Sequence, residues 1–343
     1  MSARARILTR RPVPLRALRR AARSARCAAR LAGLTTLLAL AHPAWPQELN
    51  PRAYVITPVG FNAGSVGYSH QKGDLTLDGA VPITGATANI DVVAFGYYRS
   101  LSLLGHSANV AVGLPYGVGE FAGKVADAPR SAHRSGLLDS FIRLSVNLYG
   151  GPAMGPAEFR KWSQDILVGF SLKVVAPTGQ YDHTRLINLG TNRWAFKPEL
   201  GYARRVIRPI VEAYGGIWLF TANDDFLASD PASRGERRLQ APIGALELHV
   251  SYDVSPRLWI STDFNYWYGG RVNVDGEKHL LTLQSNSRLG VTASLPINPH
   301  QSLKISYSDG LVVRFGGKFK TLSVGWQYAW FGVPFRTSAR DDG

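Results

Sequence analysis

Residues 322–330 alternate strictly between large apolar side chains and small or polar ones. This stretch constrains the fold more than any other in the chain. The large residues are Leu322, Val324, Trp326, Tyr328 and Trp330. A period of two is that of a β-strand with one apolar and one polar face. Aromatic residues at one end of the apolar face are typical of a lipid-facing strand in a membrane β-barrel. The alternative is an edge strand of a soluble β-sandwich.

The same stretch has the form of a C-terminal assembly signal of outer-membrane barrels. Such a signal has a polar residue, a glycine two positions later and then two alternating aromatic residues. Ser323, Gly325, Tyr328 and Trp330 occupy these places. We therefore predict that the barrel assembly machinery recognises this strand. Residues 332–343 follow the signal, and we expect them to form a periplasmic tail that does not pair in the barrel.

Residues 1–44 are predicted to be a secretory signal peptide with a long Arg-rich basic region. Ten arginines and no acidic residue precede Glu48. A short apolar run over residues 31–41 then ends in small residues, and cleavage is expected after Ala41 or, as the second choice, after Ala44. The run is too short to span a bilayer, which needs about 20 apolar residues. A mitochondrial transit peptide is the alternative, because transit peptides are also rich in Arg and poor in acids.

Most of the formal net charge of +15 belongs to this leader. Removing its ten arginines from the 39 Lys and Arg leaves 29, against 24 Asp and Glu, so the rest of the chain has a net charge of +5. That charge is modest and contains no basic run, so we expect no nucleic-acid partner. Cys27 is the only cysteine and lies in the leader. The exported chain is therefore predicted to have no disulfide bond and no thiolate metal site.

The rest of the chain is dominated by strand patterns. No stretch after residue 47 approaches 18 consecutive apolar residues, which excludes a helical membrane protein, and helical periodicity is limited to residues 156–164. We predict an all-β fold, a single antiparallel transmembrane β-barrel of about 12 strands over residues 61–331, after a periplasmic segment at 45–60. The candidate strands are residues 61–77, 87–99, 107–123, 134–149, 164–176, 192–204, 209–221, 239–253, 257–269, 283–296, 301–313 and 319–331.

The connections between these strands alternate in length. Short ones are expected at 100–106, 205–208, 254–256 and 297–300, and longer polar ones at 124–133, 177–191, 222–238 and 270–282. A barrel with both termini in the periplasm produces this alternation, with short periplasmic turns and long outer loops. The exceptions are a long connection at 150–163 and a short one at 314–318. The alternation favours a barrel in the outer membrane of a Gram-negative bacterium over a soluble sandwich.

Alternation within each strand assigns charged residues to the lumen, because Arg or Lys facing lipid at the midplane costs about 2–4 kcal/mol. Trp218, Trp259, Tyr214 and Phe220 would make the lumen partly apolar. The lumen is either a solute path or a narrow space filled by ion-paired side chains. The candidate lumen-lining residues are Arg143, Lys173, Lys197, Glu199, Glu212, Glu247, His249, Asp263, Arg288 and Lys304.

A catalytic site receives little support. His249 has Ser251 and Glu247 as neighbours on one strand face, so a Ser/His/acid arrangement is the only candidate for a membrane hydrolase. The chain contains no H-E-x-x-H metal motif, no phosphate-binding glycine loop before a helix and no G-x-S-x-G elbow. We predict that the protein is not an enzyme and has no metal or cofactor.

Four segments resemble one bacterial family, the outer-membrane transporters labelled as the MetA-pathway phenol degradation family. The most specific are residues 176–182 (APTGQYD) and 186–201 (LINLGTNRWAFKPELG), supported by 50–54 (NPRAY) and 284–290 (QSNSRLG). The resemblance covers nearly all of residues 48–331. It implies an outer-membrane barrel that moves hydrophobic or aromatic compounds. The long leader and the residues after 331 depart from the family pattern.

The segment 176–201 also holds the most plausible functional loop, because loops on a rigid scaffold often carry binding residues. A turn network that closes a strand pair is the alternative. Overall we expect a porin-like channel or transporter for small, hydrophobic or aromatic solutes, working by passive or facilitated diffusion. The alternative is a non-transporting structural barrel with a plugged lumen. The loop candidates are Tyr181, Asp182, His183, Arg185, Asn188, Asn192 and Arg193.

Overall fold

The computed structural model describes residues 49–76, 83–125, 127–185, 187–255 and 258–332. The predicted signal peptide and C-terminal tail lie outside these ranges, apart from Gly332. No helix in the described part of the chain is long and apolar enough to cross a membrane.

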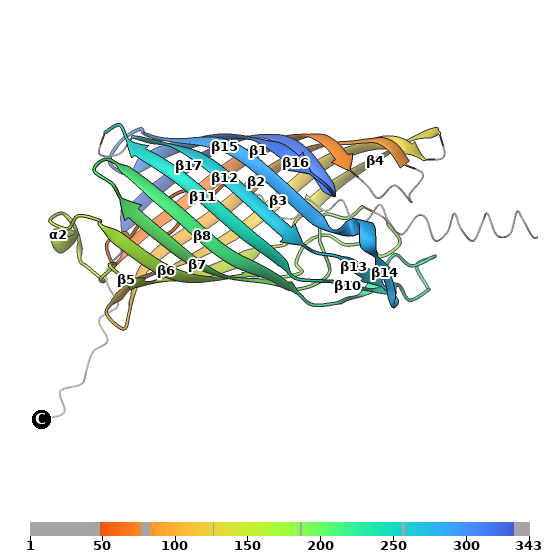
Figure 1. Cartoon of the computed structure of the whole chain (residues 1–343), viewed down its shortest axis with the longest axis horizontal. Helices are drawn as coiled ribbons and strands as arrows, with labels where there is room; N and C mark the ends of the chain where they lie inside the picture. Colours follow the sequence, from red (N-terminus) through yellow and green to blue (C-terminus); the bar gives the residue numbers. More distant parts are fainter. Residues whose placement is uncertain (1–48, 77–82, 126, 186, 256–257, 333–343) are drawn as a thin grey trace, which may run out of the picture.

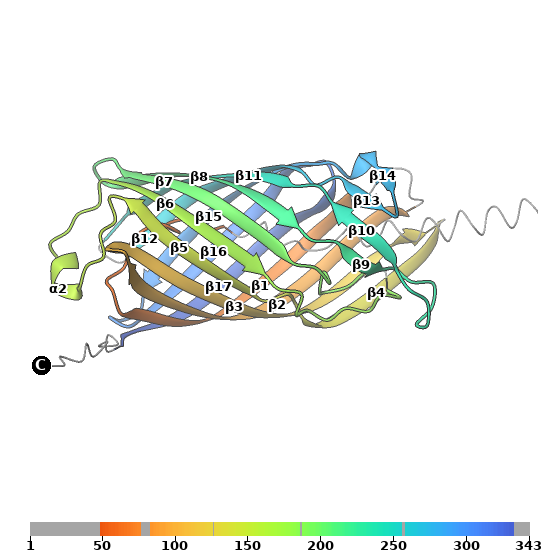
Figure 2. The ribbon, with the colours of Figure 1, turned by 90° about the horizontal axis from the view of Figure 1, so that it is seen from below.

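Twelve antiparallel strands form a closed barrel (Figure 1, Figure 2), which confirms the predicted fold class. Each strand pairs with its neighbours in sequence, and β1 closes the barrel by pairing with β17 along its whole length. Closure leaves no free sheet edge, as a membrane-spanning sheet requires. The barrel strands are β1 (Phe61–Thr76), β2 (Ile83–Leu103), β3 (His106–Val125), β5 (Phe141–Tyr149), β6 (Ile166–Val175), β7 (Ala195–Arg205), β8 (Pro209–Phe220), β11 (Ile243–Asp253), β12 (Trp259–Gly269), β15 (Gln284–Pro296), β16 (Gln301–Val313) and β17 (Gly316–Phe331).

Two predicted strands were wrong in extent, the one at 134–149 and the one at 239–253, where the barrel strand β11 begins only at Ile243. Residues 134–149 form two strands, β4 (Ala128–Leu137) and β5, because the chain is interrupted around Asp139. The Asp139 carboxylate accepts hydrogen bonds from the backbone N–H groups of Gly179 and Thr191, both at 2.9 Å. This side chain therefore ties the interruption to the loop at 176–194 and takes the chain out of the ladder. β4 instead pairs with the far half of β3.

Two predicted loops contain regular structure. Residues 222–238 and 270–282 contribute β9 (Asn223–Phe226), β10 (Glu236–Gln240), β13 (Val272–Val274) and β14 (Glu277–His279), which form a second small sheet in the order β14-β13-β10-β9. A 3₁₀ turn, η3 (Leu280–Thr282), follows β14. The connection at 150–163 contains the short helix α2 (Pro156–Phe159).

The two ends of the barrel differ. The end with Phe61, Phe331 and α2 is called the terminal end, and the opposite end, with β4 and the small sheet, is called the loop end (Figure 1). Connections at the terminal end are mostly short turns, whereas those at the loop end are longer. In outer-membrane barrels the short turns are periplasmic, so the loop end corresponds to the outer surface.

The outer wall of the barrel is an apolar band. On β11 the side chains of Leu246, Leu248, Val250 and Tyr252 are 38–50% exposed, while the alternate residues of the strand are buried in the interior. Exposed apolar residues recur on all sides of the barrel. A soluble protein rarely exposes so continuous an apolar surface, so this band matches a wall in contact with lipid.

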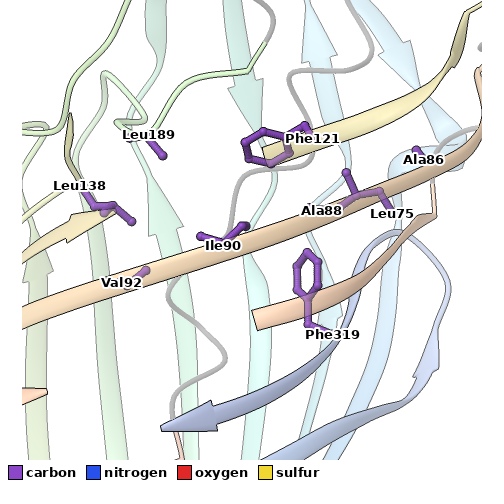
Figure 3. Close-up of a cluster of buried hydrophobic side chains, with 9 residues drawn as sticks. All are labelled: Leu75, Ala86, Ala88, Ile90, Val92, Phe121, Leu138, Leu189 and Phe319. Atoms are coloured by element: carbon purple, nitrogen blue, oxygen red, sulfur yellow. The ribbon is translucent and has the colours of Figure 1, made fainter. Parts of the chain in front are cut away.

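The interior toward the loop end contains two apolar clusters. One joins β1, β2, β3 and β17 to the loops and is centred on Ile90, Phe121 and Phe319 (Figure 3). The other lies on the opposite wall and contains Trp218, Trp267 and Ile243.

Residues 49–57 contact the inner wall or line the lumen cavity, so the predicted periplasmic position of 45–60 does not hold for them, whereas Val59 and Gly60 bond to Met154 and Ser100 at the terminal end. Tyr54 is 1% exposed, and its ring lies against Gly169 and Gly201 of β6 and β7. The Arg52 backbone N–H donates to Glu212 Oε2 at 2.9 Å. The physical reason is that polar lumen residues and facing glycines provide hydrogen-bond partners and space for this segment.

Candidate functional site

The structure places the ten predicted lumen residues on the inner wall or along its cavities. Glu212, His249 and Asp263 are at most 1% exposed, and Lys304 lines two neighbouring cavities of the lumen. Lys173 Nζ lies 4.0 Å from the centre of the Phe141 ring. Arg288 of β15 is 3% exposed.

Three strands bring a chain of opposite charges together at the middle of the lumen. Lys197 Nζ lies 2.5 Å from Glu199 Oε2 and 2.6 Å from Glu247 Oε1. Arg143 Nη2 lies 3.4 Å from Glu199 Oε1. The carboxylates are 7% exposed, so each is stable as an anion only because a cation is beside it.

The N-terminal segment joins this chain of charges. The Tyr54 hydroxyl donates to Glu199 Oε1 at 3.0 Å and lies 3.0 Å from Ser171 Oγ. The Arg143 guanidinium lies 5.1 Å from the centre of the Tyr54 ring. Nearer the terminal end, Arg52 Nη2 lies 2.5 Å from Asp253 Oδ1. The segment is therefore held to the wall by charged and hydrogen-bonded contacts.

His249 has one tight partner. Its Nδ1 lies 2.8 Å from Asp263 Oδ1, and its Nε2 lies 3.7 Å from Glu247 Oε2. Ser251 Oγ accepts a hydrogen bond from Arg52 Nε, and Ser261 Oγ donates to Asp263. Among the described residues no hydroxyl is hydrogen-bonded to His249 Nε2, which is where a nucleophile of a Ser/His/acid site would bind. The residues around His249 therefore form a buried polar network without a nucleophile–base pair.

The described residues contain no cluster of three or more His, Cys, Asp or Glu placed to hold a metal ion. The polar chemistry of the lumen consists of ion pairs and hydrogen bonds.

The lumen holds a cavity of about 680 Å³ between the N-terminal segment and the wall. Aromatic residues Trp218, Trp259 and Phe141 line it together with the ion-paired Lys197 and Glu247. Pockets for small ligands are typically 300–1,000 Å³ and mostly apolar with a few polar groups. The cavity therefore has the size and lining for a small organic molecule.

The loop candidates line a polar cleft of about 730 Å³ at the loop end, except Arg193. Asp182 and Asn188 build the turn itself, since Asn188 Oδ1 accepts the Asp182 N–H at 2.9 Å. Arg185 Nε lies 2.8 Å from Asp182 Oδ2. The Tyr181 hydroxyl donates to the Asp225 backbone carbonyl at 3.0 Å, so the loop is fastened to β9.

A second fastening is ionic. His183 Nδ1 lies 2.6 Å from Asp225 Oδ2. This hydrogen bond raises the pKa of His183 above its ordinary value of 6.5 and lowers the pKa of Asp225. Asn192 Nδ2 also donates to Asn223 Oδ1 at 3.0 Å. Side chains predicted as loop candidates thus connect two outer loops.

Arg193 points inward, and the structure brings it near a residue that sequence reasoning missed. Arg238 of β10 is 3% exposed and Arg193 is 7% exposed. Arg193 Nη2 donates to Gln240 Oε1 at 2.5 Å. Arg237 and Arg238 are adjacent in the sequence, but Arg237 is exposed and Arg238 is buried. Only the alternation of a strand at 236–240 distinguishes the two, and that short strand was not predicted.

A closed twelve-stranded antiparallel barrel with an apolar outer wall and an ion-paired lumen defines this protein as an outer-membrane-type β-barrel. The chain belongs to the family described as "Putative MetA-pathway of phenol degradation", whose model matches residues 62–327. The family predicted from the sequence is thereby confirmed.

Among solved structures, the COG4313 outer membrane channel from Pseudomonas putida F1 is similar, with a TM-score of 0.70 and 21% sequence identity over 82% of this chain and 100% of that chain. The transport unit of the autotransporter AIDA-I from Escherichia coli has a TM-score of 0.48 and 8% identity, over 86% of this chain and 96% of that one. The β domain of the Bordetella autotransporter BrkA has a TM-score of 0.45 and 11% identity, over 78% and 99%. Among curated proteins no match is found.

Proposed function

We propose that this protein is an outer-membrane channel for small, hydrophobic or aromatic solutes, which cross it by passive or facilitated diffusion. The observation that carries the proposal is the lumen cavity of about 680 Å³. Trp218, Trp259 and Phe141 give it apolar surface, and the charges beside them are paired. Membership of a family described for phenol degradation and the P. putida channel of similar fold support the same conclusion.

The charge pairing matters for the choice of solute. A water-filled pore for ions needs charged groups that face the solvent, whereas here Lys197 is held between Glu199 and Glu247 at 2.5 and 2.6 Å. Paired charges interact weakly with a passing ion but leave aromatic faces available for contact. An aromatic solute is therefore a better fit than a small inorganic ion.

A second candidate is a structural barrel whose lumen is plugged. The position of the N-terminal segment favours it, because Arg52 and Tyr54 occupy space that a solute would cross. The two functions differ in one measurable respect. A plugged barrel passes neither ions nor aromatic tracers, whereas a channel passes at least one of them.

The test is conductance of the refolded protein in planar bilayers together with uptake of N-phenylnaphthylamine by cells that express it. A lumen-facing Ser294→Trp variant should reduce uptake because Ser294 lines the cavity. The matched control is Ala293→Trp on the same strand, whose side chain points to the other face. No conductance and no uptake by the wild-type protein would refute the channel. An equal effect of both variants would show that uptake does not depend on the lumen.

We also propose that the protein is exported by its signal peptide and placed in the outer membrane by the barrel assembly machinery. Tyr328 and Trp330 of β17 are 42% and 38% exposed on the outer wall, where a partner protein or lipid can reach them. Tyr328→Ala combined with Trp330→Ala should reduce the heat-modifiable folded form in membranes. An unchanged folded fraction would exclude these residues as the signal.

A further inference from the structure

Two buried arginines lie where the lumen meets the outer loops. The Arg193 guanidinium lies 4.3 Å from the centre of the Phe220 ring, and that of Arg238 lies 5.2 Å from the centre of the Phe226 ring. Burial and, second to it, the positive charge of Arg238 lower the pKa of Arg193 well below its ordinary value. Burial also lowers the pKa of Arg238 to about 10.

Among the residues that the structure describes, neither guanidinium has an Asp or Glu oxygen within 4.0 Å, the N···O limit for an ion pair. The negative charge of Asp139 acts on Arg193, but both Asp139 carboxylate oxygens already accept hydrogen bonds from Gly179 and Thr191. Burying charge without a partner is costly, and buried charges in proteins are normally paired or bind an ion. The site as it stands therefore has an excess of positive charge.

Three buried donors at this level have no hydrogen-bond partner in the described structure, and one buried acceptor, Glu236 Oε2 of β10, has none either. Arg193 Nη1 and Arg238 Nε are buried and have no hydrogen-bond partner in the described structure, and the same holds for the indole Nε1 of Trp218. Trp218 stacks with Phe220 at 6.4 Å between ring centroids, so the three donors follow one another along this wall. Three unpartnered donors against one unpartnered acceptor call for a ligand that brings further acceptors.

These residues lie close to the outer cleft and to the lumen cavity. Tyr181 and Asp225 line the outer cleft, while Trp218 and Lys197 line the lumen cavity. Neither arginine lines the cleft or the cavity, but Arg193 contacts Phe220, which stacks with the cavity residue Trp218. The charge of Arg238 acts on Tyr181 of the cleft, so the two arginines lie close to both spaces.

We propose that Arg193 and Arg238 form a binding site for the carboxylate of a small aromatic acid, at the outer entrance of the lumen. The carboxylate would accept hydrogen bonds from Arg193 Nη1 and Arg238 Nε, in charge-assisted contacts that are stronger than neutral ones. The ring of the acid would lie on the aromatic wall at Trp218. The inference rests on the proposed channel function and narrows its substrate class to aromatic carboxylates.

The site is tested first by binding, which does not depend on transport. Benzoate is titrated into the refolded full-length barrel in detergent by isothermal titration calorimetry. Arg193→Gln and Arg238→Gln should each raise the Kd at least about tenfold, since a hydrogen bond to a charged group is lost. Arg237→Gln is the matched control, because Arg237 is 61% exposed and paired with Asp224. It should leave the Kd unchanged.

Heat-modifiable migration shows that each variant is folded, and Arg238→Gln replaces Arg193→Gln if the latter does not fold. Absence of benzoate binding by the wild-type barrel, or equal binding by folded Arg238→Gln, would overturn the proposal. Benzyl alcohol is the neutral control and should bind equally to wild type and Arg238→Gln.

Transport then separates this inference from the proposed function. In planar bilayers the reversal potential between potassium chloride and potassium benzoate gives the permeability of benzoate relative to chloride, which Arg238→Gln should lower and Arg237→Gln should not. Conductance with an unchanged benzoate ratio in Arg238→Gln would refute the site and leave the channel standing. Benzoate binding without any conductance or tracer uptake would support the site and refute the channel.

Discussion

Replacing Gly201 by alanine should push the N-terminal segment away from the barrel wall. Gly201 of β7 faces the lumen directly opposite Gly169 of β6, and the Tyr54 ring lies against this pair. A methyl group at 201 would lie 2.6 Å from Tyr54 Cζ and closer still to Cε2. Ordinary contact begins at 3.4 Å, so the ring must move by at least about 0.8 Å.

The size of the effect follows from the surroundings of Tyr54. The ring is 1% exposed, and its hydroxyl is bonded to Glu199 and close to Ser171, so it cannot shift without loss of contacts. Overpacking of this kind costs about 1–3 kcal/mol. Since every 1.4 kcal/mol is a factor of ten, the undocked population of the segment should rise roughly 5- to 140-fold.

Labelling of a cysteine at position 53 measures this population. Ala53 is next to Tyr54 in the segment, and Cys27 is the only native cysteine, so a Cys27→Ser, Ala53→Cys chain has a single thiol. A membrane-impermeant maleimide is added to the folded barrel in vesicles, and the labelling rate is compared with and without Gly201→Ala. Gly215→Ala of β8 is the control, because a methyl group there meets nothing within 4 Å.

The double variant distinguishes a steric effect from a general one. Tyr54→Ala removes the ring, so adding Gly201→Ala to it should change the labelling rate no further. Equal rates for Gly201→Ala and its parent would refute the docking of Tyr54 on this wall. So would a rise of the same size in Gly215→Ala.

The structure also predicts the direction of the effect for two further perturbations, a substitution in the lumen and a change of pH at the outer loops. Lys197→Met leaves the Glu199 and Glu247 carboxylates buried without their shared cation, so the free energy of unfolding in detergent should fall by about 3–5 kcal/mol, and an unchanged urea midpoint would contradict this. The His183–Asp225 pair should hold the outer loops together in acid. His183 has a raised pKa, so its contribution is complete below pH 6.5 and is lost as pH rises through that raised pKa. Asp225 has a pKa lowered from 3.8, so its contribution is complete above pH 3.8 and is lost as pH falls through that lowered pKa. Amide exchange at 181–185, corrected for intrinsic rates, should therefore be faster in the wild type above neutral pH than at pH 5.5, and His183→Gln should remove the difference.

The strands of the barrel were largely predictable because lipid imposes a rule at every second residue. The predicted strand at 301–313 matches β16, and that at 283–296 differs from β15 by one residue. A charge on the lipid side is costly near the midplane, so apolar and polar residues alternate along most of each strand. The break at Asp139 follows no such rule. It depends on hydrogen bonds to residues 40 and 52 positions away, which no local pattern encodes.

The candidate site was predictable as a set of lumen positions but not as a set of partners. Alternation assigns Lys197 and Glu247 to the lumen, yet their contact depends on how β7, β8 and β11 lie side by side in register. Arg238 was missed for a related reason. Its strand has only five residues and its pairing with β9 shifts register between Glu236 and Arg238, so the sequence alone does not reveal the strand.

The sequence contains a signal for the N-terminal segment inside the lumen, but this signal can be interpreted only once the fold is known. Inward positions of β6 and β7 are mostly filled by large or polar residues, but Gly169 and Gly201 leave adjacent gaps, and Tyr54 fills them. Leu49 likewise lies against the inward Gly290 of β15. A glycine in a strand often marks close approach of another chain segment. Glycines that face each other on the lumen side of a barrel therefore indicate where an internal segment docks, and here they identify the contact that holds the N-terminal segment in the lumen.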